Sequence, residues 1–230
     1  GTFLRDVFGG NIAAKNAYST TTNSYITGST NITIDASEKI VSIGGNLVAG
    51  SSGKGTVVGS TNITFKGTGE QLVFGEKSIV CGDCHDATES TGFVGGSRNL
   101  TFDGFTGTLD AQIAGFDKMD FSNGNVTLTK SSRLSEISVW NFSDGATLTF
   151  GDVNNNFAGD TLSFGSFEGD KWTVVSGSDS TLANWDWADQ VTIAGQNASF
   201  DEELGYWTSA DYKFYKEDNA LKVAKLGKLA

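Results

Sequence analysis

The densest set of chemically reactive side chains is found at residues 81–85, which read Cys-Gly-Asp-Cys-His. This order matches the Cys-x-x-Cys-His pattern through which haem is attached covalently, with the histidine as an axial ligand. Met119, the single methionine, would have to supply the other axial ligand. No helical pattern that would cover a porphyrin surrounds the motif, and two thiols with one histidine leave zinc one ligand short. We therefore predict a local disulfide between Cys81 and Cys84, and no cofactor or metal.

Residues 152–156 (Asp-Val-Asn-Asn-Asn) and Asp160 supply oxygen atoms at spacings that resemble those of a calcium loop. In a calcium loop of the EF-hand type, however, the sixth position needs glycine, and here it is Phe157. No bidentate glutamate follows at the twelfth position. A plain polar turn is the simpler interpretation.

Carboxylate pairs would be needed to hydrolyse a glycosidic bond, with the two groups about 5–10 Å apart. The 27 acidic residues offer too many candidates to choose among; Asp117/Asp120 and Asp186/Asp189 could be called pairs, but acidic solvent-exposed faces explain them equally well. A Ser-His-Asp triad would have to use His85, the only histidine, and the Gly-x-Ser-x-Gly elbow is absent from the sequence. We therefore predict that the chain is not an enzyme.

Composition places these residues in a folded, acidic, β-rich chain. The 230 residues include 30 glycines and no proline, 38% of them are apolar, and 16 are phenylalanine, which is too many for a solvated coil. The formal net charge is −11, which disfavours nucleic acid and anionic membrane surfaces as partners. No apolar run approaches the roughly 18 residues of a transmembrane helix, so we expect no membrane insertion by this chain.

Two interleaved repeats organise the first hundred residues. The segments 28–34, 59–65 and 96–102 read Gly-Ser-Thr-Asn-Ile-Thr-Ile, Gly-Ser-Thr-Asn-Ile-Thr-Phe and Gly-Ser-Arg-Asn-Leu-Thr-Phe. A second motif, Val-Phe-Gly-Gly-Asn, begins at residue 7 and recurs in altered form at residues 42 and 73. Alternating apolar and polar residues predict short strands with one buried face, and the glycines predict corners between them.

Short strands that recur with the same corners predict a β-solenoid, in which each coil stacks on the previous one. This stacking would align Asn31, Asn62 and Asn99 in a hydrogen-bonded ladder. The aligned Thr33, Thr64 and Thr101 are too few to predict an ice-binding face. Further strands are predicted at 125–128, 146–150, 161–164, 171–175 and 191–193.

The last residues differ from the repeats. Aromatic residues gather at 206–215, and alternating apolar residues with lysines follow at 220–228. A solenoid must cover its last open edge to avoid aggregation. We predict one domain over 1–230, with solenoid coils at 1–194 and a β-hairpin cap at 195–230.

These motifs resemble the passenger segments of bacterial autotransporter-like and adhesin-like surface proteins. The resemblance rests on Val-Phe-Gly-Gly-Asn, Gly-Ser-Thr-Asn-Ile-Thr and the later Phe-Ser-Asp-Gly-Ala-Thr-Leu-Thr-Phe at 142–150. It implies a right-handed parallel β-helix, exported to the extracellular side or to the outer-membrane-associated bacterial surface. The outer-membrane barrel that completes a self-secreting member of this group is not in this sequence. The resemblance assigns no catalytic residues.

We therefore expect a monomeric, non-enzymatic stalk or adhesin-like module whose partner is a host or environmental glycan or a protein surface. The alternative is a carbohydrate-binding or polysaccharide-degrading protein on the same scaffold. A row of exposed aromatic side chains would favour that alternative, and the residues to inspect are Trp140, Trp172, Trp185 and Trp187.

Overall fold

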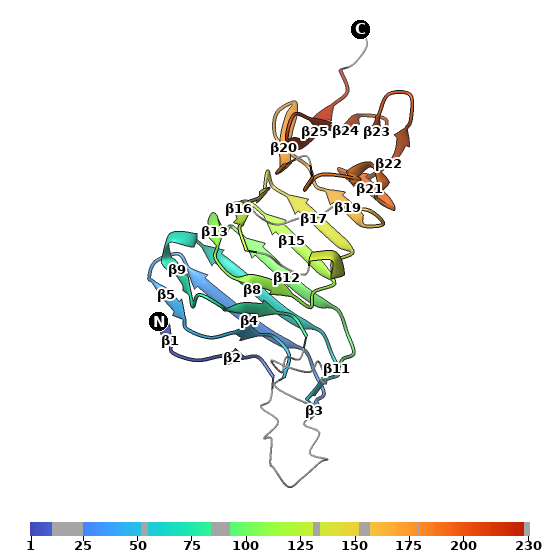
Figure 1. Ribbon diagram of the computed structural model, residues 1–230. Coiled ribbons are helices and arrows are strands. Elements are labelled where there is room, and N and C mark those ends of the chain that lie inside the picture. Colours follow the sequence, from blue (N-terminus) through green and yellow to red (C-terminus); the bar gives the residue numbers. More distant parts are fainter. Residues whose placement is uncertain are drawn as a thin grey trace.

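The computed structural model describes residues 1–10, 25–51, 55–83, 93–130, 134–151, 157–178 and 180–227. Nearly all of its regular structure is β-strand, and the strands stack along one direction from the N-terminal end to the red C-terminal strands (Figure 1). Most neighbouring strands are parallel, as the sequence predicts. The protein is thus an all-β structure of stacked parallel strands.

The longest parallel ladder is formed by one strand from each successive layer. In order, its strands are β4 (Thr30–Ala36), β8 (Thr61–Gly67), β12 (Arg98–Asp103), β15 (Lys118–Ser122), β17 (Val139–Ser143), β19 (Thr161–Phe164) and β21 (Gln190–Ile193). A second ladder on another side holds β13 (Gly107–Leu109), β16 (Asn125–Leu128), β18 (Thr147–Phe150) and β20 (Lys171–Ser176).

Three smaller parallel sheets complete the N-terminal layers. They are β1 (Thr2–Phe3), β5 (Val41–Ile43) and β9 (Leu72–Phe74); β2 (Val7–Phe8), β6 (Leu47–Val48), β10 (Ile79–Cys81) and β14 (Gln112–Ala114); and β3 (Tyr25–Ile26), β7 (Thr56–Val57) and β11 (Phe93–Val94). The chain passes through β4, β5, β6 and β7 before it returns to β8, which lies directly beside β4. Each passage therefore adds one layer to every sheet that it visits.

The repeated Asn-Ile-Thr motif sets the register of the long ladder. Ile32, Ile63 and Leu100 are Cα partners on β4, β8 and β12, and the buried position two residues later is filled by Ile34, Phe65 and Phe102. Because side chains alternate along a strand, the threonines between these positions face outward. The register thus separates a buried apolar face from a polar face.

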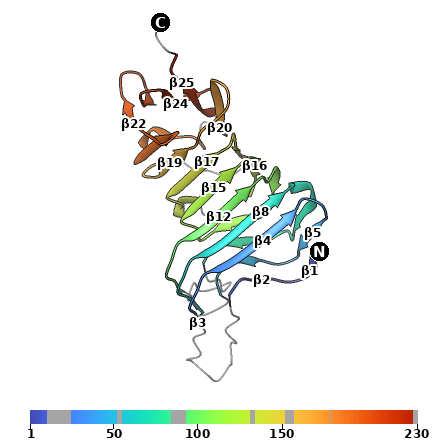
Figure 2. The ribbon, with the colours of Figure 1, turned by 180° about the vertical axis from the view of Figure 1, so that it is seen from behind.

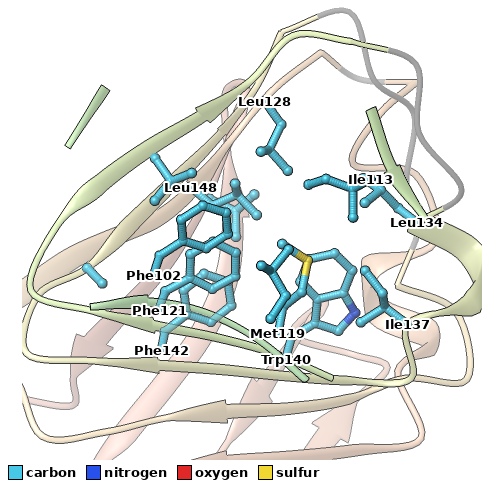
Figure 3. Packing of buried hydrophobic residues seen from close by; sticks show 14 of the residues in the cluster. Phe102, Ile113, Met119, Phe121, Leu128, Leu134, Ile137, Trp140, Phe142 and Leu148 are labelled. Carbon is cyan, nitrogen blue, oxygen red and sulfur yellow. The ribbon is translucent and has the colours of Figure 1, made fainter. Parts of the chain in front are cut away.

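Phenylalanine rings form a continuous stack inside the molecule. The rings of Phe65, Phe102, Phe121, Phe142 and Phe164 follow one another from β8 to β19, with centroids 5.7, 5.3, 4.8 and 5.8 Å apart. Figure 3 shows part of this stack beside Met119 and Trp140, facing Leu128 and Leu148 from the second ladder. Each ring contacts the equivalent ring of the next layer, so the core is continuous along the stack.

Antiparallel strands close the C-terminal end of the stack. They are β22 (Gln196–Asp201), β23 (Tyr206–Thr208), β24 (Tyr212–Glu217) and β25 (Ala220–Lys225). β22 pairs with β21 of the long ladder, whereas β25 pairs with β20 of the second ladder. The two ladders and the four closing strands therefore form one sheet of 15 strands, and the view from behind shows the closing strands over β19 and β20 (Figure 2).

Helical structure among the described residues is limited to short 3₁₀ segments. These are η1 (Gly69–Gln71), η2 (Leu134–Glu136) and η3 (Trp185–Trp187). In the described part of the chain, no helix has the length and apolarity required to cross a membrane.

Candidate functional site

The three asparagines of the repeat stand at one register position on β4, β8 and β12. Asn62 Nδ2 donates to Asn31 Oδ1 at 3.0 Å, and Asn99 Nδ2 donates to Asn62 Oδ1 at 2.8 Å. Asn62 Nδ2 also donates to the carbonyl oxygen of Thr30 at 3.1 Å. On β15 the same register position is occupied by Lys118. The amides therefore bond to one another along the stack, which is a structural role.

The outward threonine position continues beyond the repeats with other polar side chains. Thr33, Thr64 and Thr101 are in register, and the next three layers place Asp120, Asn141 and Ser163 there. Asn141 Nδ2 donates to Asp120 Oδ1 at 2.7 Å. Because the residue types change, this column does not present a uniform threonine face.

The Cys-Gly-Asp-Cys-His motif lies only partly within the described residues. Cys81 ends β10 with its side chain buried, and its Sγ lies 2.8 Å from Asp83 Oδ1. Cys84 and His85 are outside the described residues, so the disulfide stays a prediction. Met119, the second axial ligand in the haem alternative, is fully buried in the core beside the phenylalanine stack.

A charged cluster formed by Arg98, Asp117 and Asp83 lies beside this motif. Arg98 binds Asp117 through two guanidinium nitrogens, with Nε 3.1 Å from Oδ2, and its Nη1 lies 3.7 Å from Asp83 Oδ2. The hydrogen bond from Arg98 lowers the pKa of Asp117 below its usual range. An ionised carboxylate held in this way is unsuited to general-acid chemistry, and Asp120 bonds to Asn141 instead. Asp117 is thus paired with Arg98, and Asp120 with Asn141 and with Lys118, whose Nζ lies 3.1 Å from Asp120 Oδ1.

The tryptophans do not form an exposed row. Trp140, Trp172 and Trp185 are buried, and Trp187 alone among these four is exposed, at 65% of its surface. The indole nitrogens of two of them are used within the protein: Trp140 Nε1 donates to Asp160 Oδ2 at 2.9 Å and Trp172 Nε1 donates to the Ala146 carbonyl at 3.1 Å. The feature that would favour an extended aromatic platform for polysaccharide is thus not found at these positions.

Asp160 is a half-buried carboxyl, and burial raises its pKa to about 6 although the hydrogen bond from Trp140 opposes the rise. Residues 152–156 of the calcium-like segment lie outside the described residues. Among the described residues, no group of three or more His, Cys, Asp or Glu side chains is placed to hold a metal ion.

A hollow of about 620 Å³ lies beside the turns that follow β15 and β17, where β20 begins. Its lining consists of Asn123, Asp144 and Gly145 from these turns, residues 166–168, Lys171 and Trp172. Asp160 is not part of this lining. The repeats do not extend to these residues, so the sequence does not predict the site.

Strand pairing explains why the hollow exists. β20 pairs antiparallel with β25 from Lys171 to Ser176, with Trp172 opposite Val223, but it pairs in parallel with β18 only at Val175 and Ser176. The first residues of β20 therefore pair with β25 alone, and pairing with the second ladder begins at Val175. The side chain of Trp172 extends back to the Ala146 carbonyl across the resulting gap.

Comparison of the chain with protein-family models, with curated proteins and with solved structures finds no match.

Proposed function

We propose that the chain is a right-handed parallel β-solenoid that serves as a non-enzymatic stalk or adhesin-like module of an exported bacterial surface protein. In this proposal it acts as a monomer, outside the cell or at the outer-membrane-associated surface, and presents its flanks to a glycan or protein surface. The resemblance to autotransporter-like passengers supports the export and the handedness.

One observation carries the mechanical part of the proposal: the polar and apolar side chains of the repeat are used to join one layer to the next. The asparagine amides bond along the stack, and the phenylalanine rings stack in the same direction. Such residues provide cohesion and length, as in other repeat proteins in which each unit contacts its neighbours.

The alternative of a polysaccharide-degrading enzyme has one supporting observation, the raised pKa of Asp160. A protonated carboxyl near neutral pH is what a glycosidase uses as its general acid. Asp160 nevertheless bonds to the buried Trp140 and does not line the hollow. The non-enzymatic function is therefore favoured.

Deletion of one complete layer tests the proposal. Lys118 and Val139 are Cα partners, so removal of residues 118–138 places β17 directly on β12 and β18 on β13. Trp140 and Phe142 would then meet Leu100 and Phe102. We expect a folded, monomeric protein that is shorter by one strand spacing, about 4.8 Å, as measured by circular dichroism and small-angle scattering.

A matched control deletes residues 118–128, which removes β15 and β16 but leaves residues 129–138, including η2, without the rest of their layer. We expect this variant to be unfolded or aggregated.

The same proteins are incubated with neutral and acidic polysaccharides, and release of reducing ends is measured against heat-denatured protein. Saturable release by the full chain, abolished in Asp160→Asn, would overturn the non-enzymatic function in favour of hydrolysis.

A further inference from the structure

We infer that the hollow beside β20 is a binding site for a neutral saccharide of about two sugar units. The inference is independent of whether the chain is exported, because it rests on the side chains around the hollow. At about 620 Å³ the hollow lies within the range of sites that bind small molecules.

The apolar part of the lining is aromatic and is held in place. The rings of Phe167 and Trp172 lie 5.7 Å apart, and the indole of Trp172 is fixed by its bond to the Ala146 carbonyl. Lys225 Nζ lies 5.7 Å from the centroid of the Phe167 ring, and Tyr212 packs 5.9 Å from it. Trp172 is only 6% exposed, so the half-buried ring of Phe167 is the main carbon surface of the lining. A sugar ring has an apolar face of C–H groups that packs on such a surface, and an aromatic ring that is already fixed loses little entropy on binding.

The polar part of the lining matches hydroxyl groups. Asp144 and Glu168 present carboxylates, Asn123 presents an amide and Ser166 a hydroxyl. The hydroxyls of Ser122 and Ser143 both bond to Asp144 Oδ2 at 3.2 Å, so that the carboxylate is oriented before a ligand arrives. Carboxylates accept hydrogen bonds from sugar hydroxyls, and side-chain amides both donate to them and accept from them.

The charge of the lining selects against anionic ligands. Lys171 is its one cation, and Lys171 Nζ is already paired with Glu217 Oε2 at 2.7 Å. The carboxylates of Asp144 and Glu168 remain, in a chain whose formal net charge is −11. Phosphorylated, sulfated or uronic saccharides would be repelled, whereas a neutral saccharide meets acceptors without a charge penalty.

Gly145 leaves space open beside the lining of the hollow. Gly145 has a φ of +74°, and a Cβ atom built on it meets no other atom within 4 Å. Gly145 lines the hollow, and a side chain at this position would extend into open space next to that lining. Gly195 has nearly the same conformation, with a φ of +79° and no atom within 4 Å of a built Cβ, but it lies in the turn between β21 and β22.

These two glycines provide a matched pair of variants for the test. Asparagine tolerates the left-handed region better than most residues, so Gly145→Asn and Gly195→Asn carry similar backbone costs. The full chain and both variants are titrated with cellobiose, xylobiose, mannobiose, maltose and lactose. Calorimetry measures the affinity, and tryptophan fluorescence reports on the surroundings of Trp172.

We expect at least one of these disaccharides to bind saturably to the full chain and to Gly195→Asn with equal affinity. Gly145→Asn should weaken binding by at least about tenfold, and Glu168→Gln should weaken it by several fold. Binding of a neutral ligand should be unchanged between low salt and 1 M NaCl, because no ion pair is formed.

Three results would each overturn the inference: no binding by any of the five disaccharides, equal binding by Gly145→Asn, or stronger binding of the cationic probe spermidine that disappears in salt. The last result would identify the hollow as a cation-binding surface. None of them would alter the outcome of the layer deletion, so the two proposals fail separately.

Discussion

Replacement of Asp160 by asparagine should remove most of the pH dependence of stability between pH 4.5 and 7.5. Asp160 is the residue immediately before β19. Its Oδ2 accepts a hydrogen bond from the indole N–H of Trp140. Asparagine can accept the same bond through its side-chain oxygen, because the two side chains have the same shape. The substitution therefore removes the ionisation and leaves the contact with Trp140 intact.

The direction and size of the effect follow from the pKa. Burial raises the pKa of Asp160 from 3.8 to about 6, so the folded protein binds this proton more tightly than the unfolded chain does. The resulting stabilisation is fully present below pH 3.8 and is lost as the pH rises through about 6. The difference between the two pKa values corresponds to ~3 kcal/mol of free energy of unfolding. Solvent screening of this half-buried carboxyl reduces the expected effect to ~1–2 kcal/mol.

Urea unfolding followed by circular dichroism at pH 4.5, 5.5, 6.5 and 7.5 measures the free energy of unfolding of both proteins. We expect similar stability at pH 4.5, and Asp160→Asn to be more stable by ~1–2 kcal/mol at pH 7.5. Asp189→Asn, at an exposed carboxyl in the next layer, serves as the control. A constant difference between Asp160→Asn and the full chain at all four pH values would refute the reasoning.

Two further predictions concern the core and the closing strands. Phe121 lies between Phe102 and Phe142 in the ring stack, so Phe121→Ala should lower the free energy of unfolding by ~3–5 kcal/mol and Phe121→Leu by less, measured by urea unfolding. A loss below about 1 kcal/mol for the alanine variant would contradict a continuous core. Deletion of residues 201–230 removes β23, β24 and β25 and leaves β20 and β22 without these partners. Light scattering should then detect aggregation, and a soluble monomer with an unchanged melting temperature would exclude a capping role.

Sequence alone predicts the parts of the fold in which the outward and inward residues both recur. The Asn-Ile-Thr motif predicts β4, β8 and β12 in the register that the structure has. The sequence does not predict β15 and β17, because their outward residues differ from the Asn and Thr of the repeat. In β15, however, Met119 and Phe121 keep the inward apolar positions, and Trp140 and Phe142 keep them in β17.

The candidate sites were less predictable for a physical reason. The pKa of Asp160 depends on burial and on Trp140, 20 residues earlier in the sequence, and neither belongs to a recognisable motif. The hollow depends on the point at which β20 begins to pair with β18, at Val175, while β25 pairs with β20 along its whole length. The residues of a strand carry no signature for the point at which pairing with one of its two neighbours begins.

The continuous sheet of 15 strands makes the two ends of the molecule mechanically unequal. β25 is hydrogen-bonded to β24 on one side and to β20 on the other, so tension applied after Lys225 is shared by many bonds that must shear together. Tension applied at residue 1 falls on β1, which is paired with β5 through Thr2 and Phe3. A molecule pulled from both ends should therefore lose its layers in order from β1. The end closed by β22–β25 should stay folded longest, so it can serve as the anchor.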